Sequence, residues 1–169
     1  IMLQSLVKDI LRFFLLISFQ VLLLNNINLG GLFNPYLYIL FILILPFEIS
    51  GWLLLTLSFI TGFSVDYFSH QHGLHTAACV FLGFVRPSVL KYFAPREGYE
   101  NAVEPNIYVF GFSWFFKYIV ICTLIHHTVL FYLEIFRFSD FFFTLARTLI
   151  SSIFTVVLIV LAEYMFYRK

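Results

Sequence analysis

Charged side chains are scarce in this sequence. Asp, Glu, Lys and Arg make up 11% of the 169 residues, less than half of the roughly 25% found in soluble domains. Hydrophobic residues make up 62%, and the mean hydropathy is +0.96. A water-soluble fold of this length could not bury so many apolar side chains in one core. We therefore expect an integral membrane protein whose surface is largely in contact with lipid.

Strong basic charge, abundant cysteine and a cleavage site are also missing. The formal net charge of +1 gives no electrostatic basis for binding nucleic acid. The two cysteines, Cys79 and Cys122, lie in apolar runs, so we expect buried free thiols rather than a disulfide. The first apolar run has no small-residue cleavage site and ends in NNINLGG, which is not typical of a secretory signal peptide.

Apolar segments are the dominant feature of the chain. A membrane-spanning helix needs about 20 apolar residues, and the polar breaks between segments mark its ends. The pattern predicts a single all-α membrane domain over 1–169, a six-transmembrane-helix bundle with a polar connection at 94–106. The predicted spans are about 7–24, 34–47, 51–68, 74–93, 107–133 and 141–166.

The second of these spans is short or kinked. Its apolar run, 36–47, would rise about 18 Å as a helix, well short of a hydrocarbon core about 30 Å thick. The segment is either re-entrant, or begins early at Asn34, or continues through a kink at Pro46 into the next span. The kinked alternative would leave five spans, with the termini on opposite sides of the membrane.

The distribution of Lys and Arg favours six spans, because basic residues accumulate on the cytoplasmic side. With five spans the asymmetry blurs. With six, both termini and the 94–106 connection are cytoplasmic, and the loops 25–34, 66–75 and 134–140 face outward. The outer side then carries only Arg137 and Arg147, whereas the inner side carries Lys8, Arg12, Arg86, Lys91, Arg96, Lys117, Arg168 and Lys169.

Small side chains form a stripe on the last predicted span. At 3.6 residues per turn they share one narrow face, and small residues let helix backbones approach each other inside lipid. We expect this stripe to pack within the bundle; docking of a partner's transmembrane helix is the alternative. Its members are Thr144, Thr148, Ser151, Thr155 and Ala162.

Polar residues gather in the stretch GFSVDYFSHQHGLHTAACVFLGFVRP, residues 62–87. Its three histidines, His70, His72 and His75, could converge with the pair His126 and His127 at the outer face, and imidazole binds zinc, copper, iron and nickel. However, residues two apart on a helix do not face each other, and no HExxH, paired CxxC or i,i+4 histidine pair is present. The sequence therefore predicts no metal site and no cofactor.

Two catalytic or transport interpretations are weaker than a structural one. Asp66 and Glu163 are candidates for a proton relay, because a charge in the bilayer costs at least about 2.5–3.5 kcal/mol, but both lie near helix ends and no duplicated halves are visible. Ser64 and Ser69 have no GxSxG setting. We expect no enzyme here: Gly73 permits an unusual backbone conformation, Asp66 caps nearby backbone donors, and together they shape a turn.

The same stretch resembles a known family. Gly62, Asp66, Gly73, Leu74, His75, Ala77 and Ala78 resemble the Gly–x3–Asp…(Leu/Gly)–x–His–Ala signature of MreD, the rod shape-determining membrane protein. The order of NNINLGGLFNPYLYILFILILPFE, the aspartate segment and RPSVLKYFAPREGYE is similar to the form found in Bacteroidota. The resemblance covers nearly the whole chain, and His70 and His72 depart from it.

This resemblance implies a scaffold rather than an enzyme. MreD proteins belong to the cell-elongation machinery of the bacterial inner membrane, with MreC, the actin-like MreB, the glycosyltransferase RodA and a class B penicillin-binding protein. They help to organise peptidoglycan synthesis and cell shape. They also resemble the six-helix substrate-binding subunits of energy-coupling-factor vitamin transporters, so a small-molecule-binding transporter subunit is the alternative function.

The resemblance also implies roles for individual residues. Asp66, Gly73 and His75, with Gly62, would shape the outward re-entry. Arg86, Pro87 and the segment 91–104, which includes Arg96, would form a cytoplasmic face for MreB or another partner. MreC would contact either the stripe at Thr148, Ser151 and Thr155 or the aromatic face around Trp114, Phe115 and Phe116. A transporter subunit would instead need an outward pocket of several hundred Å³ with convergent polar groups, and the 24 Phe residues favour filled positions.

Overall fold

The computed structural model describes residues 2–27, 34–95, 98–99, 104–136 and 140–166. Across these residues the backbone forms helices and connections, with no β-strand. The prediction of an all-α protein is confirmed. The long helices are α1 (Met2–Leu22), α3 (Gly51–Ser69), α4 (Leu74–Tyr92), α6 (Phe112–Ile135) and α7 (Phe141–Phe166). The short ones are η1 (Leu24–Asn26), η2 (Leu37–Ile39), α2 (Leu40–Leu43) and α5 (Ile107–Phe110).

Membrane-spanning character is clearest in three of these helices. Within the described residues, α3, α6 and the Phe141–Met165 part of α7 are long and apolar enough to cross a membrane. Large apolar side chains such as Phe59, Phe116 and Ile153 are exposed on their outer faces. Because water would not stabilise such surfaces, the chain is a helical membrane protein.

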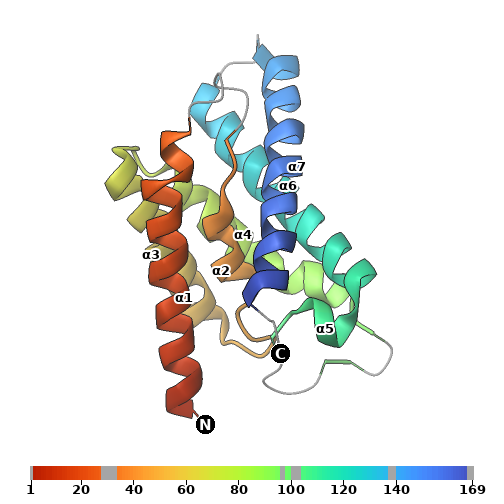
Figure 1. Ribbon diagram of the computed structural model, residues 1–169. Coiled ribbons are helices and arrows are strands. Elements are labelled where there is room, and N and C mark those ends of the chain that lie inside the picture. The colour runs from red at the N-terminus through yellow and green to blue at the C-terminus, as the bar shows by residue number, and fades with distance from the viewer. Residues whose placement is uncertain (1, 28–33, 96–97, 100–103, 137–139, 167–169) are drawn as a thin grey trace.

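The long helices form one bundle. Helix α3 packs against α4, α4 against α6, and α6 against α7, while α1 lies beside α3 (Figure 1). The start of α1 and the end of α7 lie at the same end of the bundle, at the bottom of Figure 1. The α3–α4 turn, the end of α6 and the start of α7 lie toward the opposite end.

The second predicted span is not a continuous helix. Only Leu37–Leu43 is helical, and seven residues rise about 10 Å where about 30 Å is needed. The residues from Leu37 to Leu45 are all buried, and α2 packs among α1, α3 and α4. In Figure 1 the orange and tan segment descends from the upper end of α1 to the start of α3. Its apolar character therefore reflects burial inside protein rather than contact with lipid.

The predicted fifth span, 107–133, is interrupted near its start. Asn106 begins α5, because its side-chain oxygen accepts hydrogen bonds from the amides of Tyr108 (3.0 Å) and Val109 (2.8 Å). Gly111 then takes φ +80°, which ends this short helix after Phe110. Helix α6 starts at Phe112 in a new direction, so the apolar run contains one turn that hydrophobicity alone does not mark.

Candidate functional site

Asp66 joins the end of α3 to the beginning of α4. One carboxylate oxygen accepts a hydrogen bond from the amide of His75 (3.1 Å). The other accepts hydrogen bonds from the amide (2.8 Å) and the hydroxyl (2.6 Å) of Thr76. The carboxylate thus satisfies amides that the first turn of a helix leaves without partners. Asp66 is buried, and both of its oxygens are used in this cap.

Glycines allow the two helices to meet so closely. A Cβ on Gly62 would lie 2.5 Å from the Cα of Thr76 and 2.6 Å from the carbonyl oxygen of His75, so no larger residue fits without moving α4. Gly73 precedes α4 with φ +87°, a conformation that glycine adopts without strain. Gly62, Asp66, Gly73 and His75 therefore form one unit, which we call the α3–α4 joint.

A hydrogen-bonded chain of aromatic and imidazole groups lies beneath this joint. The hydroxyl of Tyr38 lies 2.8 Å from Nδ1 of His75 and 2.9 Å from Nε2 of His126. The chain continues from Nδ1 of His126 to Nδ1 of His127 (3.5 Å), and from Nε2 of His127 to the hydroxyl of Thr155 (3.0 Å). All five residues are buried, so the network ties η2, α4, α6 and α7 together.

The imidazoles of this network are buried and contact no carboxylate among the described residues, so they are neutral. Their hydrogen-bond partners then determine which ring nitrogen carries the hydrogen. Nδ1 of His127 lies 3.0 Å from the carbonyl of Thr123, which can only accept, so this nitrogen carries the hydrogen. The facing Nδ1 of His126 must then hold a lone pair, and its Nε2–H donates to Tyr38. The Tyr38 hydroxyl in turn donates to Nδ1 of His75, which leaves Nε2–H of His75 as a donor.

His75 also lines a polar pocket of about 390 Å³. The pocket lies at the end of the bundle that holds the α3–α4 turn. Across it, Arg147 pairs with Glu134 (3.0 Å) and stacks over the ring of Phe131 (4.3 Å). The pocket is thus several hundred Å³ in size and polar. Other polar side chains in its wall are Asn25, Asn26, Asn34, Tyr36, Ser69 and Gln71, and its apolar lining residues are Val21, Leu24, Pro35 and Phe68.

Arg86 does not lie on the cytoplasmic face expected from the sequence. Its side chain is 1% exposed, and its Nε donates to the hydroxyl of Tyr118 (3.0 Å). The guanidinium also donates to the carbonyls of Leu43, Leu45 and Pro46. The first two are carbonyls that the end of α2 leaves without amide partners. Arg86 therefore holds the broken second segment in place and is not available to MreB. Pro87, the next residue, is exposed.

The Ser/Thr stripe of α7 faces the interior of the chain. Thr148, Ser151 and Thr155 are buried. The hydroxyls of Ser151 and Thr155 accept hydrogen bonds from the amides of Asn34 (3.2 Å) and Tyr36 (3.0 Å). Of the two alternatives left open by the sequence, packing within the bundle is therefore the one observed, and the stripe is not exposed to a partner helix.

The aromatic residues at the start of α6 do not form one exposed face either. Phe115 is fully buried and Phe116 is exposed. The indole of Trp114 donates to the carbonyl of Phe93 (2.8 Å) and lies near the ring of Tyr99. Trp114 thus anchors the end of α4 instead of presenting a free surface.

The remaining histidines do not join the buried network. His70 ends α3 in the left-handed conformation (φ +54°), and both His70 and His72 are exposed. In the described part of the chain, no group of three or more His, Cys, Asp or Glu side chains is placed to hold a metal ion. Cys79 and Cys122 are buried free thiols, as predicted.

Ion pairs organise the end of the bundle where α1 begins. Glu104 pairs with Arg12 (2.8 Å) and Lys8 (3.4 Å), which ties the predicted cytoplasmic connection to α1. Arg96 lies outside the described residues. Glu163 is buried, and its Oε1 has no hydrogen-bond partner among the described residues. It lies near the end of α7, at the opposite end of the bundle from Asp66 and the α3–α4 turn, so the two acids do not form one relay.

Sequence reasoning found the α3–α4 joint but missed two parts of the interior. The role of Tyr38 could not be predicted from the sequence, because a tyrosine in an apolar run is typical of a membrane-interface position as well as of a core. The partners of Arg86 come from segments forty residues away, which no local pattern reveals. Comparisons of the chain with protein-family models, curated proteins and solved structures find no match.

Proposed function

We propose that the chain is a non-enzymatic membrane scaffold subunit of the cell-elongation (rod) complex, which binds MreC and helps to organise peptidoglycan synthesis and cell shape. The α3–α4 joint supports this proposal. Gly62, Asp66, Gly73 and His75, the residues that carry the resemblance to MreD, meet in one place, and each has a structural task there. If these residues are shared with MreD, the shared function is to hold two helices together and not to catalyse a reaction.

The polar side chains near the joint favour a structural role over catalysis. Both oxygens of Asp66 are occupied by α4. The hydroxyl of Ser64 donates to the carbonyl of Ile60 (2.7 Å) on its own helix, and the hydroxyl of Ser69 accepts a hydrogen bond from the side-chain amide of Asn25 (2.7 Å). A nucleophile needs a base within hydrogen-bond reach and a group to orient that base, and neither of these hydrogen bonds joins a serine to such a base.

The proposed location is the bacterial cytoplasmic membrane, with six passes and both termini in the cytoplasm. The position of the two chain ends at one end of the bundle supports an even number of passes (Figure 1). The second pass is the broken segment around α2, buried in the bundle. Non-helical backbone is tolerated at membrane depth when protein surrounds it. The arrangement would then correspond to the six-segment bundle of energy-coupling-factor substrate-binding subunits.

MreC is the proposed direct partner, and RodA, the class B penicillin-binding protein and MreB are further members of the proposed assembly. At the inner end, exposed Pro87 and Lys91 remain candidates for a cytoplasmic contact, whereas Arg86 does not. Membrane lipid surrounds the exposed faces of α6 and α7.

Co-purification tests this proposal. The tagged chain would be co-expressed with MreC and with the energy-coupling module of the same organism, and the bound protein identified after extraction in mild detergent. We expect MreC to be retained at a fixed stoichiometry and the energy-coupling module to be lost. Retention of the energy-coupling module without MreC would contradict the scaffold function.

The polar pocket favours a second candidate function, a small-molecule-binding subunit of a vitamin-type transporter. A volume of about 390 Å³ lies within the usual range for ligand sites, and His75, Glu134 and Arg147 are among the polar residues that line it. Mass spectrometry of the purified chain distinguishes the two functions. A small molecule that is bound by the wild-type protein and lost in His75→Phe would support the transporter subunit; its absence would support the scaffold.

A further inference from the structure

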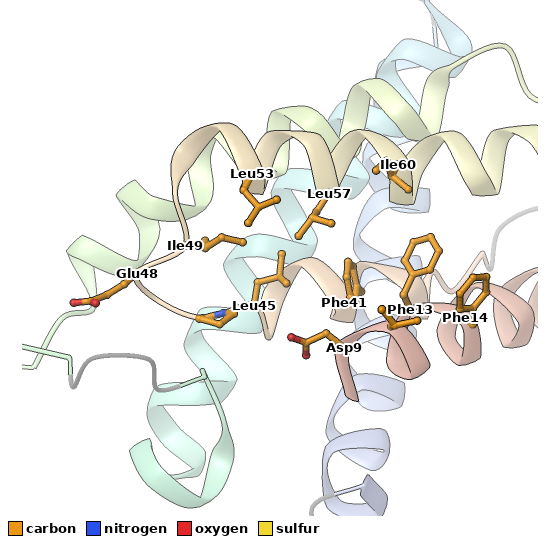
Figure 2. Close-up of a pocket in the computed structure, with 12 residues that line it drawn as sticks. Asp9, Phe13, Phe14, Phe41, Leu45, Glu48, Ile49, Leu53, Leu57 and Ile60 are labelled. Atoms are coloured by element: carbon orange, nitrogen blue, oxygen red, sulfur yellow. The ribbon is translucent and has the colours of Figure 1, made fainter. Parts of the chain in front are cut away.

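An apolar groove of about 640 Å³ runs along one side of the bundle. Figure 2 shows its two walls and its floor. Phe13 and Phe14 of α1 form one wall, Leu57 and Ile60 of α3 form the other, and Phe41 of the broken segment lies between them. The groove exists because the second segment is too short and too deeply buried to fill the space between α1 and α3.

The groove is open to its surroundings. Phe14 and Ile60 are 62% and 42% exposed at its rim, whereas Phe41 is buried at its floor. Inside a membrane such a concave apolar surface is occupied either by lipid chains or by the side chains of another helix. A groove with large aromatic side chains on one wall and aliphatic side chains on the other offers the complementary packing on which helix association in lipid depends.

Charge decides between these two occupants. Glu48 lines the end of the groove away from Phe14, and Asp9 lies between Glu48 and Phe14, near Phe41 (Figure 2). No basic residue lines the groove among the described residues. Glu48 is exposed, while Asp9 lies 3.4 Å from Arg12. Glu48 lies at the end of the bundle where α3 begins, the inner end in the proposed orientation. Because Asp9 is already paired with Arg12, the exposed carboxylate of Glu48 supplies the negative charge that repels anionic lipid head groups and attracts cations.

We propose that this groove binds one apolar transmembrane helix of a partner, with Lys or Arg at its cytoplasmic flank paired to Glu48. Single helices carry such basic residues on the cytoplasmic side, so the positive flank would meet the Glu48 carboxylate when the helix lies along the groove. The inference rests on the proposed function for its orientation and for its partner, the transmembrane helix of MreC. It assigns that helix to α1 and α3 rather than to the stripe of α7 or the aromatic residues of α6.

A pair of matched substitutions tests the groove. Ile60→Trp fills it, whereas Ile153→Trp adds the same bulk to a lipid-exposed position on α7, 64% exposed and outside the groove. The chain and MreC would be co-expressed and the retained MreC quantified. We expect Ile60→Trp to reduce retention about tenfold, which corresponds to about 1.4 kcal/mol, and Ile153→Trp to leave it unchanged.

The charges are tested separately. Glu48→Lys should reduce MreC retention, and a Lys→Glu or Arg→Glu change at the cytoplasmic flank of the MreC helix should restore it. Asp140→Lys, an exposed acid at the other end of the bundle, is the control and should have no effect. Restoration by the reciprocal change would not follow if the groove held lipid.

Photo-crosslinking covers the case in which Ile60→Trp impairs folding. A photoreactive amino acid at position 60 should crosslink to MreC, and the same amino acid at position 153 should not. If wild-type protein retains MreC but Ile60→Trp retains it equally, or position 60 crosslinks only to lipid, the groove inference is overturned and the scaffold function stands. If wild-type protein does not retain MreC, both are overturned.

Discussion

At the scale of single residues, the α3–α4 joint depends on one carboxylate and on the absence of two side chains. The Asp66 carboxylate accepts hydrogen bonds from amides at the start of α4 that have no carbonyl partner within the helix, and Gly62 leaves space for the backbone at Thr76. Each residue acts locally, and each has a matched position elsewhere in the chain where the same change should be harmless.

Replacing Asp66 by Ala would leave the amides of His75 and Thr76 without their acceptors. Buried donors without partners cost about 1–3 kcal/mol, so the free energy of unfolding should fall by that amount. Thermal unfolding in detergent, followed by circular dichroism, measures the loss. Asp140→Ala, at an exposed position, should leave the midpoint unchanged. Equal midpoints for the two variants would refute the capping role.

Gly62→Ala should separate α3 from α4, because its Cβ would collide with the backbone of Thr76 at 2.5 Å. Overpacking of this kind costs about 1–3 kcal/mol. Gly51→Ala is the control, since a Cβ at Gly51 meets nothing within 4 Å, and alanine favours the helix. Unfolding in detergent should therefore begin at a lower temperature for Gly62→Ala only. A stable Gly62→Ala protein would mean that the helices are not in such close contact.

At the scale of elements, the broken second segment is the feature that organises the bundle. Its helical part, Leu37–Leu43, ends where Arg86 donates to the carbonyls of Leu43, Leu45 and Pro46. For Leu43 and Leu45, the Arg86 side chain thus supplies donors in place of the amides that a longer helix would have provided. The shortness of α2 also leaves the groove between α1 and α3.

Arg86→Met should loosen this segment without unfolding the protein. The carbonyl of Leu45 would lose its donor, whereas those of Leu43 and Pro46 would keep the Tyr118 hydroxyl and the Ile49 amide. The loss should lower the local stability by about 1–3 kcal/mol. Hydrogen–deuterium exchange followed by mass spectrometry should show faster exchange over residues 40–47, with α6 unchanged. Lys91→Met, one turn further along α4 and exposed, provides the control. Unchanged exchange over 40–47 in Arg86→Met would show that other contacts hold the segment.

The ends of most helices could be predicted from the sequence, but the nature of the second segment could not. Polar breaks at Gly51, Gly73 and Asp140 mark where α3, α4 and α7 begin, and the predicted starts of these helices agree with the structure. Hydrophobicity does not distinguish burial in protein from contact with lipid, so 34–47 was predicted as a span. Arg86 was predicted at the surface because its acceptors are supplied only by the tertiary fold.

The α3–α4 joint could be predicted, whereas the network below it could not. Glycine and aspartate at a helix junction act through local rules of turns and caps. His126 and His127 meet Tyr38 and Thr155 only after α6, α7 and η2 have packed, so their partners depend on the fold. His70 and His72, which attracted the metal hypothesis, remain exposed at the turn.

At the scale of the whole molecule, the two ends of the bundle differ in chemistry. One end holds the chain termini, Lys8, Arg12 and Glu104, and the other holds the α3–α4 turn and the polar pocket (Figure 1). The proposed orientation places the first end in the cytoplasm. Buried Cys79 and Cys122 leave little background for labelling of introduced cysteines.

Site-directed labelling tests this orientation. His72→Cys places a thiol at the turn and Lys91→Cys places one at the opposite end, both at exposed positions. A membrane-impermeant maleimide added to intact spheroplasts should label position 72 and not position 91, and lysis should make position 91 reactive. Labelling of both positions from outside, or of position 91 alone, would contradict the proposed topology.

Native mass spectrometry of the chain purified after co-expression with MreC tests the central claim most directly. The scaffold function predicts a species whose mass is the sum of the chain and MreC, with no additional small molecule. A species containing the chain and a bound small molecule, and no MreC, would contradict it and would assign the polar pocket as the functional site.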